Sequence, residues 1–389
     1  MTKLGKSLPI ALAAAVGVIT LGPSPAMAAA NGWELAAMSV PGAQKITRGA
    51  GVTVAVIDTG VRTGHAALKG RATAGPDFLE ETDQNEPYYG LHGTAMASDV
   101  LDVAPEAKVL SLRAIRDDED PDFDTWSSSL DDDKGAAATA VDRAIRAAVD
   151  AGAKVISMSL GSITSLGAYS RDQASAIAYA MSKNVVVIAS AGNEGDESNQ
   201  LSYPAAYPGV IAVGATTPDR KRAGFSQVHT YVDVAAPGVE IYAADIGGGR
   251  KKIQGTSPAA ALAAGVAALI KSKYPDLTPR QVEQLLEKTA STYAKGYNPQ
   301  TGYGVINAAA ALKAAAGLKA ASAALPVGEQ GAGIHFGPGD DGTPRFTGQE
   351  LNSTYLVIGG VFGGIALLGI ALGMLLFITG RRAAARSRP

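Results

Sequence analysis

Three short segments carry side chains that can act together in acyl transfer. Asp58 follows the apolar run 54–57 and precedes Thr-Gly, His92 precedes Gly-Thr, and Ser257 follows Gly-Thr. Acyl transfer needs a nucleophile, a base that accepts its proton and a group that orients this base. We therefore predict that Ser257 is the nucleophile, that His92 is the general base and that Asp58 holds the imidazole in the required tautomer.

A fourth segment offers a donor for the oxyanion of such a reaction. The apolar run 185–190 continues into Ala-Gly-Asn-Glu-Gly, with Asn193 at its centre. The side-chain amide of Asn193 and the backbone N–H of Ser257 are the two predicted donors. Each motif alone is common in turns and loops, but the four in this order predict a serine peptidase. The histidines outside this pattern, predicted to be surface or loop residues, are His65, His229 and His335.

Alternating strands and helices are predicted to position these groups. Short apolar runs bounded by Gly, Pro or polar residues favour buried parallel strands. The predicted strands are 52–57, 108–114, 154–160, 185–190 and 210–215, and the predicted helices are 136–151, 171–182, 257–274, 278–289 and 306–315. This alternation predicts an α/β fold with a mostly parallel central sheet and helices on both faces.

The two ends of the chain indicate export and membrane anchoring. Lys3 and Lys6 precede an uncharged run, and Ala26-Met27-Ala28 follows it, so residues 1–28 are predicted to be a secretory signal peptide. The run is too short for a retained membrane helix, which needs about 20 apolar residues. Residues 351–380 carry no charge and precede four arginines, which predicts one transmembrane helix and a basic cytoplasmic tail, 381–389. The expected location is the cell membrane, single-pass, with the catalytic domain extracytoplasmic.

The remaining divisions follow from length and composition. Residues 29–50 are too few for a separate domain and form an N-terminal extension, 51–316 form the peptidase domain, and the Ala/Gly/Pro-rich segment 317–350 is a linker.

The chain contains no cysteine, which excludes disulfides and thiolate metal sites, and we predict neither cofactor nor metal. The net charge is −2 even with the basic residues of both ends, which argues against nucleic-acid binding.

An acidic insertion separates one predicted strand from the next helix. It contains Asp-Asp-Glu-Asp at 117–120 and three aspartates at 131–133. Such a run is typical of a solvated loop. Two functional interpretations also stay open: a rim that faces the substrate and favours basic peptides, or a weak calcium site.

On these motifs the chain resembles the subtilisin-like serine peptidases from about residue 45 to residue 316. The resemblance implies their three-layer fold and protein or peptide substrates. It also implies that Ser159, Leu160 and Gly161 pair with the bound peptide backbone and form one wall of the pocket for the side chain before the scissile bond. The signal peptide, short extension, linker, single helix and basic tail look like those of the mycosins, membrane-anchored peptidases of type VII secretion. That resemblance implies a secretion complex as partner.

Two departures from the family pattern stand out. Pro258 follows the serine directly, and Ala261 occupies the position where the family usually has proline. A proline restricts the residue before it, so Ser257 is expected to avoid helical dihedral angles. The cysteine pair of many mycosins is also missing. Membrane anchoring and Pro258 leave an alternative function open, that of a structural subunit of a secretion complex with little or no activity, which the intact set of four motifs opposes.

Overall fold

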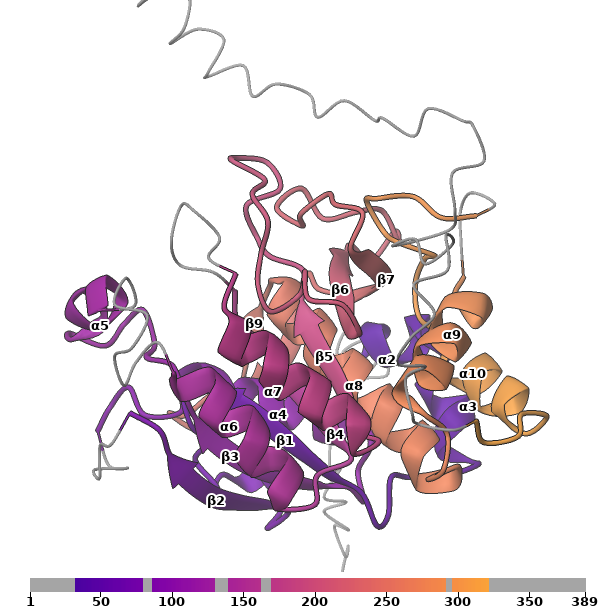
Figure 1. The fold of residues 1–389 in the computed structure, drawn as a ribbon, viewed down its shortest axis with the longest axis horizontal. Coiled ribbons are helices and arrows are strands. Elements are labelled where there is room, and N and C mark those ends of the chain that lie inside the picture. Colours follow the sequence, from indigo (N-terminus) through magenta and orange to yellow (C-terminus); the bar gives the residue numbers. More distant parts are fainter. Residues whose placement is uncertain (1–31, 80–85, 130–138, 162–168, 292–295, 322–389) are drawn as a thin grey trace, which may run out of the picture.

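A seven-stranded parallel sheet forms the centre of the described chain (Figure 1). The computed structural model describes residues 32–79, 86–129, 139–161, 169–291 and 296–321. Within these ranges the strands are β1 Thr53–Asp58, β2 Ala72–Asp77, β3 Lys108–Arg113, β4 Val155–Met158, β5 Val186–Ser190, β6 Val210–Thr216 and β7 Val232–Pro237. A separate antiparallel hairpin joins β8 Ile241–Ala244 to β9 Arg250–Ile253.

Helices cover both faces of the sheet. They are α2 Trp33–Ala37, α3 Val40–Gln44, α4 Leu91–Val103, α5 Phe123–Ser129, α6 Ala140–Asp150, α7 Arg171–Ser182, α8 Thr256–Lys273, α9 Pro279–Thr289 and α10 Ala308–Ala315, with a short 3-10 turn at Ala66–Leu68. Alternate residues of β1 enter two different cores, because successive strand side chains point to opposite faces. Val54 and Val56 pack with α4 and α8, whereas Ala55 and Ile57 pack with α6 and α7. The predicted α/β class with a mostly parallel central sheet is confirmed.

Predicted and observed boundaries agree where the sequence pattern is strong. Helix α7 has the predicted bounds, and Thr278 begins α9 with a capping box to Gln281. Several elements were not predicted. They are the edge strand β2, strand β7, the hairpin β8–β9, the 3-10 turn, helices α2 and α3 of the N-terminal extension, helix α4 that carries His92, and helix α5 within the acidic insertion. Strand β2 has mostly solvent-facing residues and lacks an apolar run, so its sequence resembles a loop.

The strand order creates a crevice at one end of the sheet. The order is β2-β3-β1-β4-β5-β6-β7, so the chain leaves β1 toward one edge and returns to form β4 on the other side. In such sheets ligands bind beyond the carboxyl ends of the strands where the direction changes. Asp58 is the last residue of β1, and residues 159–161 follow β4 directly.

The described part of the N-terminal extension packs on the peptidase body. Met38, Val40 and Ala43 are buried in the core that contains α8. The side-chain amide of Gln44 donates hydrogen bonds to the carbonyls of Asp102 and Val103 at the end of α4, both at 2.9 Å. The described part of the extension thus contributes to the core, and the predicted boundary at residue 50 stays a prediction.

The predicted targeting and anchoring segments lie outside the described residues. These are the signal peptide 1–28, most of the linker 317–350, the membrane helix 351–380 and the tail 381–389. Among the helices that the structure does describe, none combines the length and the apolar character that a bilayer span requires.

Candidate active site

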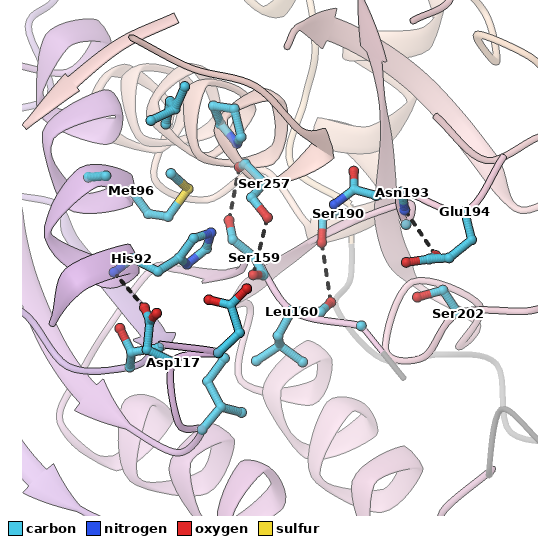
Figure 2. A pocket seen from close by; sticks show the side chains of 18 of the residues that line it. His92, Met96, Asp117, Ser159, Leu160, Ser190, Asn193, Glu194, Ser202 and Ser257 are labelled. Atoms are coloured by element: carbon cyan, nitrogen blue, oxygen red, sulfur yellow. Dashed lines mark hydrogen bonds between the residues drawn. The ribbon is translucent and has the colours of Figure 1, made fainter. Parts of the chain in front are cut away.

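All the predicted site residues except Asp58 line one cleft beyond the carboxyl ends of the strands (Figure 2). The cleft encloses about 850 Å³. His92, Ser257, Asn193 and the segment 159–161 line it. Asp58 is fully buried behind His92 and does not reach the cleft. Residues far apart in the sequence are therefore adjacent, as the motif order predicts.

Asp58 orients the ring of His92. Its Oδ1 accepts one hydrogen bond from the Thr59 N–H at 2.7 Å and another from Nδ1 of His92 at 2.8 Å. With its proton on Nδ1, the neutral ring presents Nε2 as an acceptor. Burial alone would lower the pKa of His92, but the Asp58 carboxylate, together with Asp117 and Asp118, outweighs burial and raises this pKa above 6.5. The ring is thus a base stabilised in its protonated form.

Glycine after the histidine allows α4 to approach the end of β1. A Cβ atom at Gly93 would lie 2.0 Å from the Gly60 carbonyl oxygen, so only glycine fits there. The Gly93 N–H donates to the Thr59 hydroxyl at 3.1 Å. The Gly60 loop and the first turn of α4 are therefore in direct contact, which brings His92 to Asp58.

Ser257 is the second residue of α8. The helix begins at Thr256 after Gly255, whose φ of 149° lies in a region that favours glycine. Pro258 is the third helical residue, where its missing N–H costs no intrahelical bond. The expectation that Pro258 keeps Ser257 out of the helix is wrong, because the surrounding contacts of α8 outweigh the local preference of a pre-proline residue.

The serine hydroxyl is directed toward β4 in this structure. Ser257 Oγ lies 3.4 Å from the Ser159 carbonyl oxygen, a long contact for a hydroxyl donor. In return, the Ser159 hydroxyl donates to the Ser257 carbonyl at 2.9 Å. No hydrogen bond between these described side chains joins Ser257 Oγ to the His92 ring. Such contacts often shorten only when substrate binds, and rotation about one side-chain torsion reorients the hydroxyl.

Asn193 is held by the first residue of α8. Its Oδ1 accepts hydrogen bonds from the Thr256 N–H at 2.9 Å and from the Thr256 hydroxyl at 3.0 Å. This network assigns Oδ1 to the helix side and leaves Nδ2 as the outward donor. Nδ2 has no acceptor among the described residues, so it is available to a negatively charged oxygen at the cleft.

The segment 159–161 forms one wall of the cleft. The Ser190 hydroxyl donates to the Leu160 carbonyl at 3.2 Å, which ties this wall to the end of β5. At Gly161 a Cβ atom would lie 2.8 Å from the Ser202 hydroxyl, so this part of the cleft is narrow. The predicted substrate-binding role of Ser159, Leu160 and Gly161 stays a prediction, now with a position at the cleft.

The chain matches one known protein family over more than half of its length. The model of the Subtilase family matches residues 49–305. The chain belongs to the subtilase family. Subtilisin DY from Bacillus licheniformis is 36% identical over 267 residues, which are 68% of this chain and 92% of that protein. Thermitase from Thermoactinomyces vulgaris is 36% identical over 245 residues, 61% of this chain and 80% of that protein. This subtilase is therefore a subtilisin-like serine peptidase.

Solved structures give a narrower likeness. MycP1 from the ESX-1 type VII secretion system has a TM-score of 0.62 and 28% identity over 72% of this chain and 85% of that one. The MycP3 protease from the type VII (ESX-3) secretion system has a TM-score of 0.60 and 30% identity, covering 72% of this chain and 88% of that one. The resemblance to mycosins inferred from the chain's architecture is confirmed.

Sequence reasoning missed several residues of the subtilase cleft. Asp117 lies beside His92, and Ser190 and Ser202 line the wall near residues 159–161. One signal pointed to Asp117: it follows β3, which pairs with β1, and the carboxyl ends of parallel neighbours meet. Assignment of the acidic insertion to a solvated loop alone is wrong for Asp117 and Asp120, which are buried.

The other described histidines have local roles. His65 accepts a hydrogen bond from the Ala67 N–H and caps the 3-10 turn. Nε2 of His229 lies 2.7 Å from the Asn199 carbonyl oxygen, and the ring stacks on Tyr231. His335 lies outside the described residues.

One group of carboxylates in the described part of this subtilase has the spacing of a metal site. Oxygens of Asp233, Glu283 and Glu287 lie within 4.8 Å of one another, where α9 packs on β7. None of the three lines the cleft. Burial raises the pKa of all three groups, that of Glu287 to about 7, because it favours the neutral form of each carboxyl.

Proposed function

We propose that this subtilase is a serine endopeptidase anchored in the cell membrane, with Ser257, His92 and Asp58 as its catalytic triad. The observation that carries the proposal is the 2.8 Å contact between Asp58 and His92 at a cleft that also holds Ser257 and Asn193. Orientation of an imidazole by a buried carboxylate next to a serine is the arrangement that acyl transfer requires.

The proposed reaction forms and breaks an acyl-enzyme. Ser257 Oγ attacks the scissile carbonyl while its proton moves to Nε2 of His92. The oxyanion of the tetrahedral intermediate accepts hydrogen bonds from Asn193 Nδ2 and from the Ser257 N–H. His92 then donates the proton to the leaving amine, and Asp58 stabilises the imidazolium throughout. Water then attacks the carbonyl of the acyl-enzyme while its proton moves to Nε2 of His92. His92 returns a proton to Ser257 Oγ, which releases the second product.

The proposed substrates are exported proteins or components of a type VII secretion system. Two observations support this setting. Solved relatives of similar fold come from type VII secretion systems. In addition, the chain carries an N-terminal signal pattern and an uncharged segment, 351–380, followed by arginines. An extended segment of such a protein would pair with residues 159–161 and place its carbonyl at Ser257.

An active-site label tests the proposed chemistry. The full-length protein is treated with a fluorophosphonate, which reacts only with an activated serine. We expect labelling of the wild type and of His65→Ala, a matched histidine variant whose side chain is outside the cleft, and no labelling of Ser257→Ala or His92→Ala. A folded wild type that resists the label would show that the constellation is not active.

Cell fractionation tests the proposed anchoring. The full chain should remain with membranes after a high-salt wash, and a chain that ends at residue 350 should appear in the soluble extracytoplasmic fraction. Recovery of both proteins in the soluble fraction would exclude an anchor within residues 351–389.

A structural subunit of low activity is the second candidate. The observation that favours it is the missing hydrogen bond between Ser257 and His92. Complementation separates the two functions in a strain that lacks the gene. Restoration of secretion by Ser257→Ala to the wild-type level would show that the complex uses the fold, whereas failure of a normally accumulated Ser257→Ala protein would show that it uses the peptidase.

A further inference from the structure

We propose that Asp117 is a positioning residue for His92: it caps the helix that carries His92 and places a second carboxylate beside the base. The inference rests on the proposed function only for its consequence on rate, because the contact itself belongs to the fold. It assigns a role to a residue of the acidic insertion that the triad does not use.

Helix α4 lacks a capping side chain of its own. It begins at Leu91 after Gly90, which provides no side-chain hydrogen bond. The N–H of His92, which is free of intrahelical partners in the first turn, donates instead to Oδ2 of Asp117 at 3.1 Å. The other oxygen of Asp117 accepts from the Glu119 N–H at 3.2 Å. A carboxylate from another loop therefore performs the capping function at the residue that carries the base.

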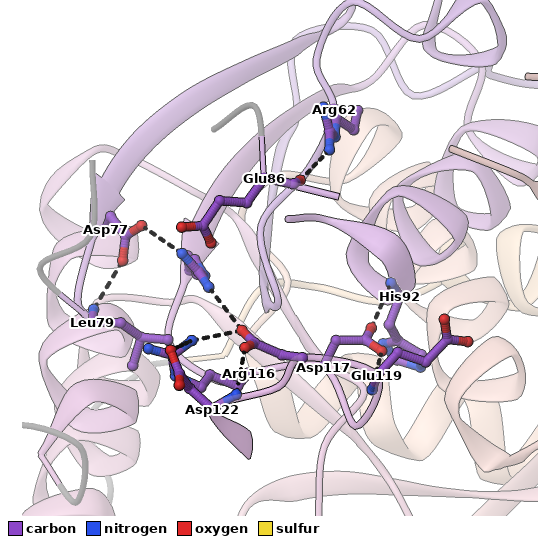
Figure 3. A network of polar contacts seen from close by, with 11 residues as sticks. Arg62, Asp77, Leu79, Glu86, His92, Arg116, Asp117, Glu119 and Asp122 are labelled. Atoms are coloured by element: carbon purple, nitrogen blue, oxygen red, sulfur yellow. Dashed lines mark hydrogen bonds and ion pairs between the residues drawn. The ribbon is translucent and has the colours of Figure 1, made fainter. Parts of the chain in front are cut away.

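A network of ion pairs holds this loop in place (Figure 3). Asp120 is buried and lies 3.7 Å from Arg113 at the end of β3 and 2.6 Å from Arg116. Arg113 also lies 3.5 Å from Asp77 of β2. Arg116 contacts the more exposed Asp122 at 3.8 Å. Asp117 is 6% exposed, so the segment presents it to α4 from a fixed framework rather than from a free acidic loop.

The charges around His92 favour its protonated form. Asp58 reaches the ring from β1, and Asp117 and Asp118 face it from the loop after β3. The other charged side chains that line the cleft are Arg116, Glu194 and Lys251. Burial, assisted by the hydrogen bond to Asp118, raises the pKa of Asp117 to about 6, so this carboxylate is charged above that pH. At neutral pH and above, Asp117 therefore adds negative charge next to the histidine that becomes positive during the reaction.

Loss of the Asp117 charge should shift the pH profile of kcat/KM to lower pH. The free enzyme needs neutral His92, so kcat/KM falls as the pH drops through the pKa of His92. Removal of the Asp117 charge lowers this pKa and moves the acid limb to lower pH. A nearby charge typically shifts a pKa by 1 to 3 units, and because His92 is partly exposed we expect about 0.5 to 1 unit. The rate at pH 8 falls roughly 3- to 10-fold, because the imidazolium is less stabilised.

Four variants of the full-length protein separate the cap from the charge. Asp117→Asn keeps an acceptor oxygen for the His92 N–H and removes the charge, whereas Asp117→Ala removes both. Asp117→Glu keeps the charge and tests rescue. Asp122→Asn is the matched control, because it removes one charge from the same loop where the side chain is 73% exposed. Two quantities are measured against pH: the rate of fluorophosphonate labelling, and the pKa of His92 from histidine hydrogen exchange read by mass spectrometry.

We expect the His92 pKa and the acid limb to move together to lower pH in Asp117→Asn, and to keep the wild-type position in Asp117→Glu and Asp122→Asn. Asp117→Ala should show the same shift with a larger loss of rate, because the first turn of α4 also loses its cap. An unchanged His92 pKa in Asp117→Asn, or an equal shift in Asp122→Asn, overturns the proposal. If the wild type is never labelled, the proposed function fails, and the exchange measurement still decides the role of Asp117.

Discussion

At the scale of single residues, the site depends on which atom of each polar group is already occupied. Asp58 uses Oδ1 to orient His92, and Asn193 uses its oxygen to bind Thr256. The first bond leaves Nε2 of the His92 ring as an acceptor, and the second leaves Nδ2 of the Asn193 amide as a donor. These are the two atoms that the proposed reaction uses. The proposed role of Asn193 in the oxyanion site therefore depends on an amide donor whose direction is set by α8.

Removal of that donor should affect turnover rather than binding. We expect Asn193→Ala to lower kcat roughly 100- to 1000-fold, the loss typical of one oxyanion donor, with little change in KM. Asn193→Asp keeps an acceptor for Thr256 but offers no amide N–H, so it should lose at least as much. Steady-state kinetics on a peptide substrate give both constants. A tenfold rise in KM at unchanged kcat in either variant would assign Asn193 to substrate binding instead.

At the scale of elements, close approach between α4 and the end of β1 fixes the distance from Asp58 to His92. Gly93 is required because a Cβ atom there would lie 2.0 Å from the Gly60 carbonyl oxygen. Gly64 is on the loop that follows β1 and has open space around it, without a positive φ. The two glycines therefore form a matched pair for a test.

Addition of one methyl group should distinguish them. We expect Gly93→Ala to lower the free energy of unfolding by about 1 to 3 kcal/mol, the usual cost of overpacking. It should also lower kcat roughly 100-fold, because a displacement of about 1 Å of the base is enough for that loss. Gly64→Ala should change neither quantity. Urea unfolding and peptide hydrolysis provide the measurements, and wild-type activity in Gly93→Ala would show that α4 does not need this contact.

The carboxylates between β7 and α9 give the stability of the fold a pH dependence. Their pKa values are raised in the folded state, that of Glu287 from 4.5 to about 7. Groups of this kind stabilise the fold below the unfolded pKa, and that stability is lost as the pH rises through the folded pKa. We therefore expect the wild type to lose stability between about pH 4.5 and pH 7 at this cluster.

Replacement of one member tests this linkage. Glu287→Gln should remove part of the stability loss that occurs as the pH rises. At pH 8 it should stabilise the protein by about 1 to 2 kcal/mol, after allowance for solvent screening. Glu197→Gln, at an exposed position away from α9, serves as control. Urea midpoints between pH 5 and pH 8, measured with a chelator present, provide the comparison. A parallel pH dependence in wild type and Glu287→Gln would contradict the assignment.

At the scale of the whole molecule, the N-terminal extension completes the core. Met38 is fully buried, and its carbonyl accepts a hydrogen bond from the Ala308 N–H at 2.8 Å at the start of α10. Val40 and Ala43 continue the same contact. Such a segment stabilises the fold, whereas an inhibitory segment would occupy the cleft. Among the described residues, which start at residue 32, the first that lines the cleft is Thr59.

Truncation of one side chain in the extension should reduce stability without activation. We expect Met38→Ala to cost about 2 to 5 kcal/mol, as is usual when a buried methionine is cut back to alanine. The labelling rate per folded molecule should not change. Ile46→Ala, at an exposed position of the same segment, should have little effect. Calorimetry and fluorophosphonate labelling test both statements, and faster labelling of Met38→Ala would indicate that the extension restrains the site.

The sequence by itself determined the residue types of the site and the class of the fold. The motifs around Asp58, His92, Asn193 and Ser257 are local, since each combines a reactive side chain with the glycines that allow close approach. Likewise, the buried strands are marked by short apolar runs, and helices α7 and α9 by capping residues at their first turns. Each of these patterns extends over only a few residues. Such signals are readable along the chain because their causes are local.

Only the tertiary structure decided which of these groups touch. The order of the strands brings the loop after β3 to the first turn of α4, so Asp117 meets His92 although 25 residues separate them. The tertiary structure also places Ser257 in helix α8 despite Pro258. It directs the Ser257 hydroxyl toward the Ser159 carbonyl. These outcomes depend on packing between distant segments, which no local pattern of residues specifies.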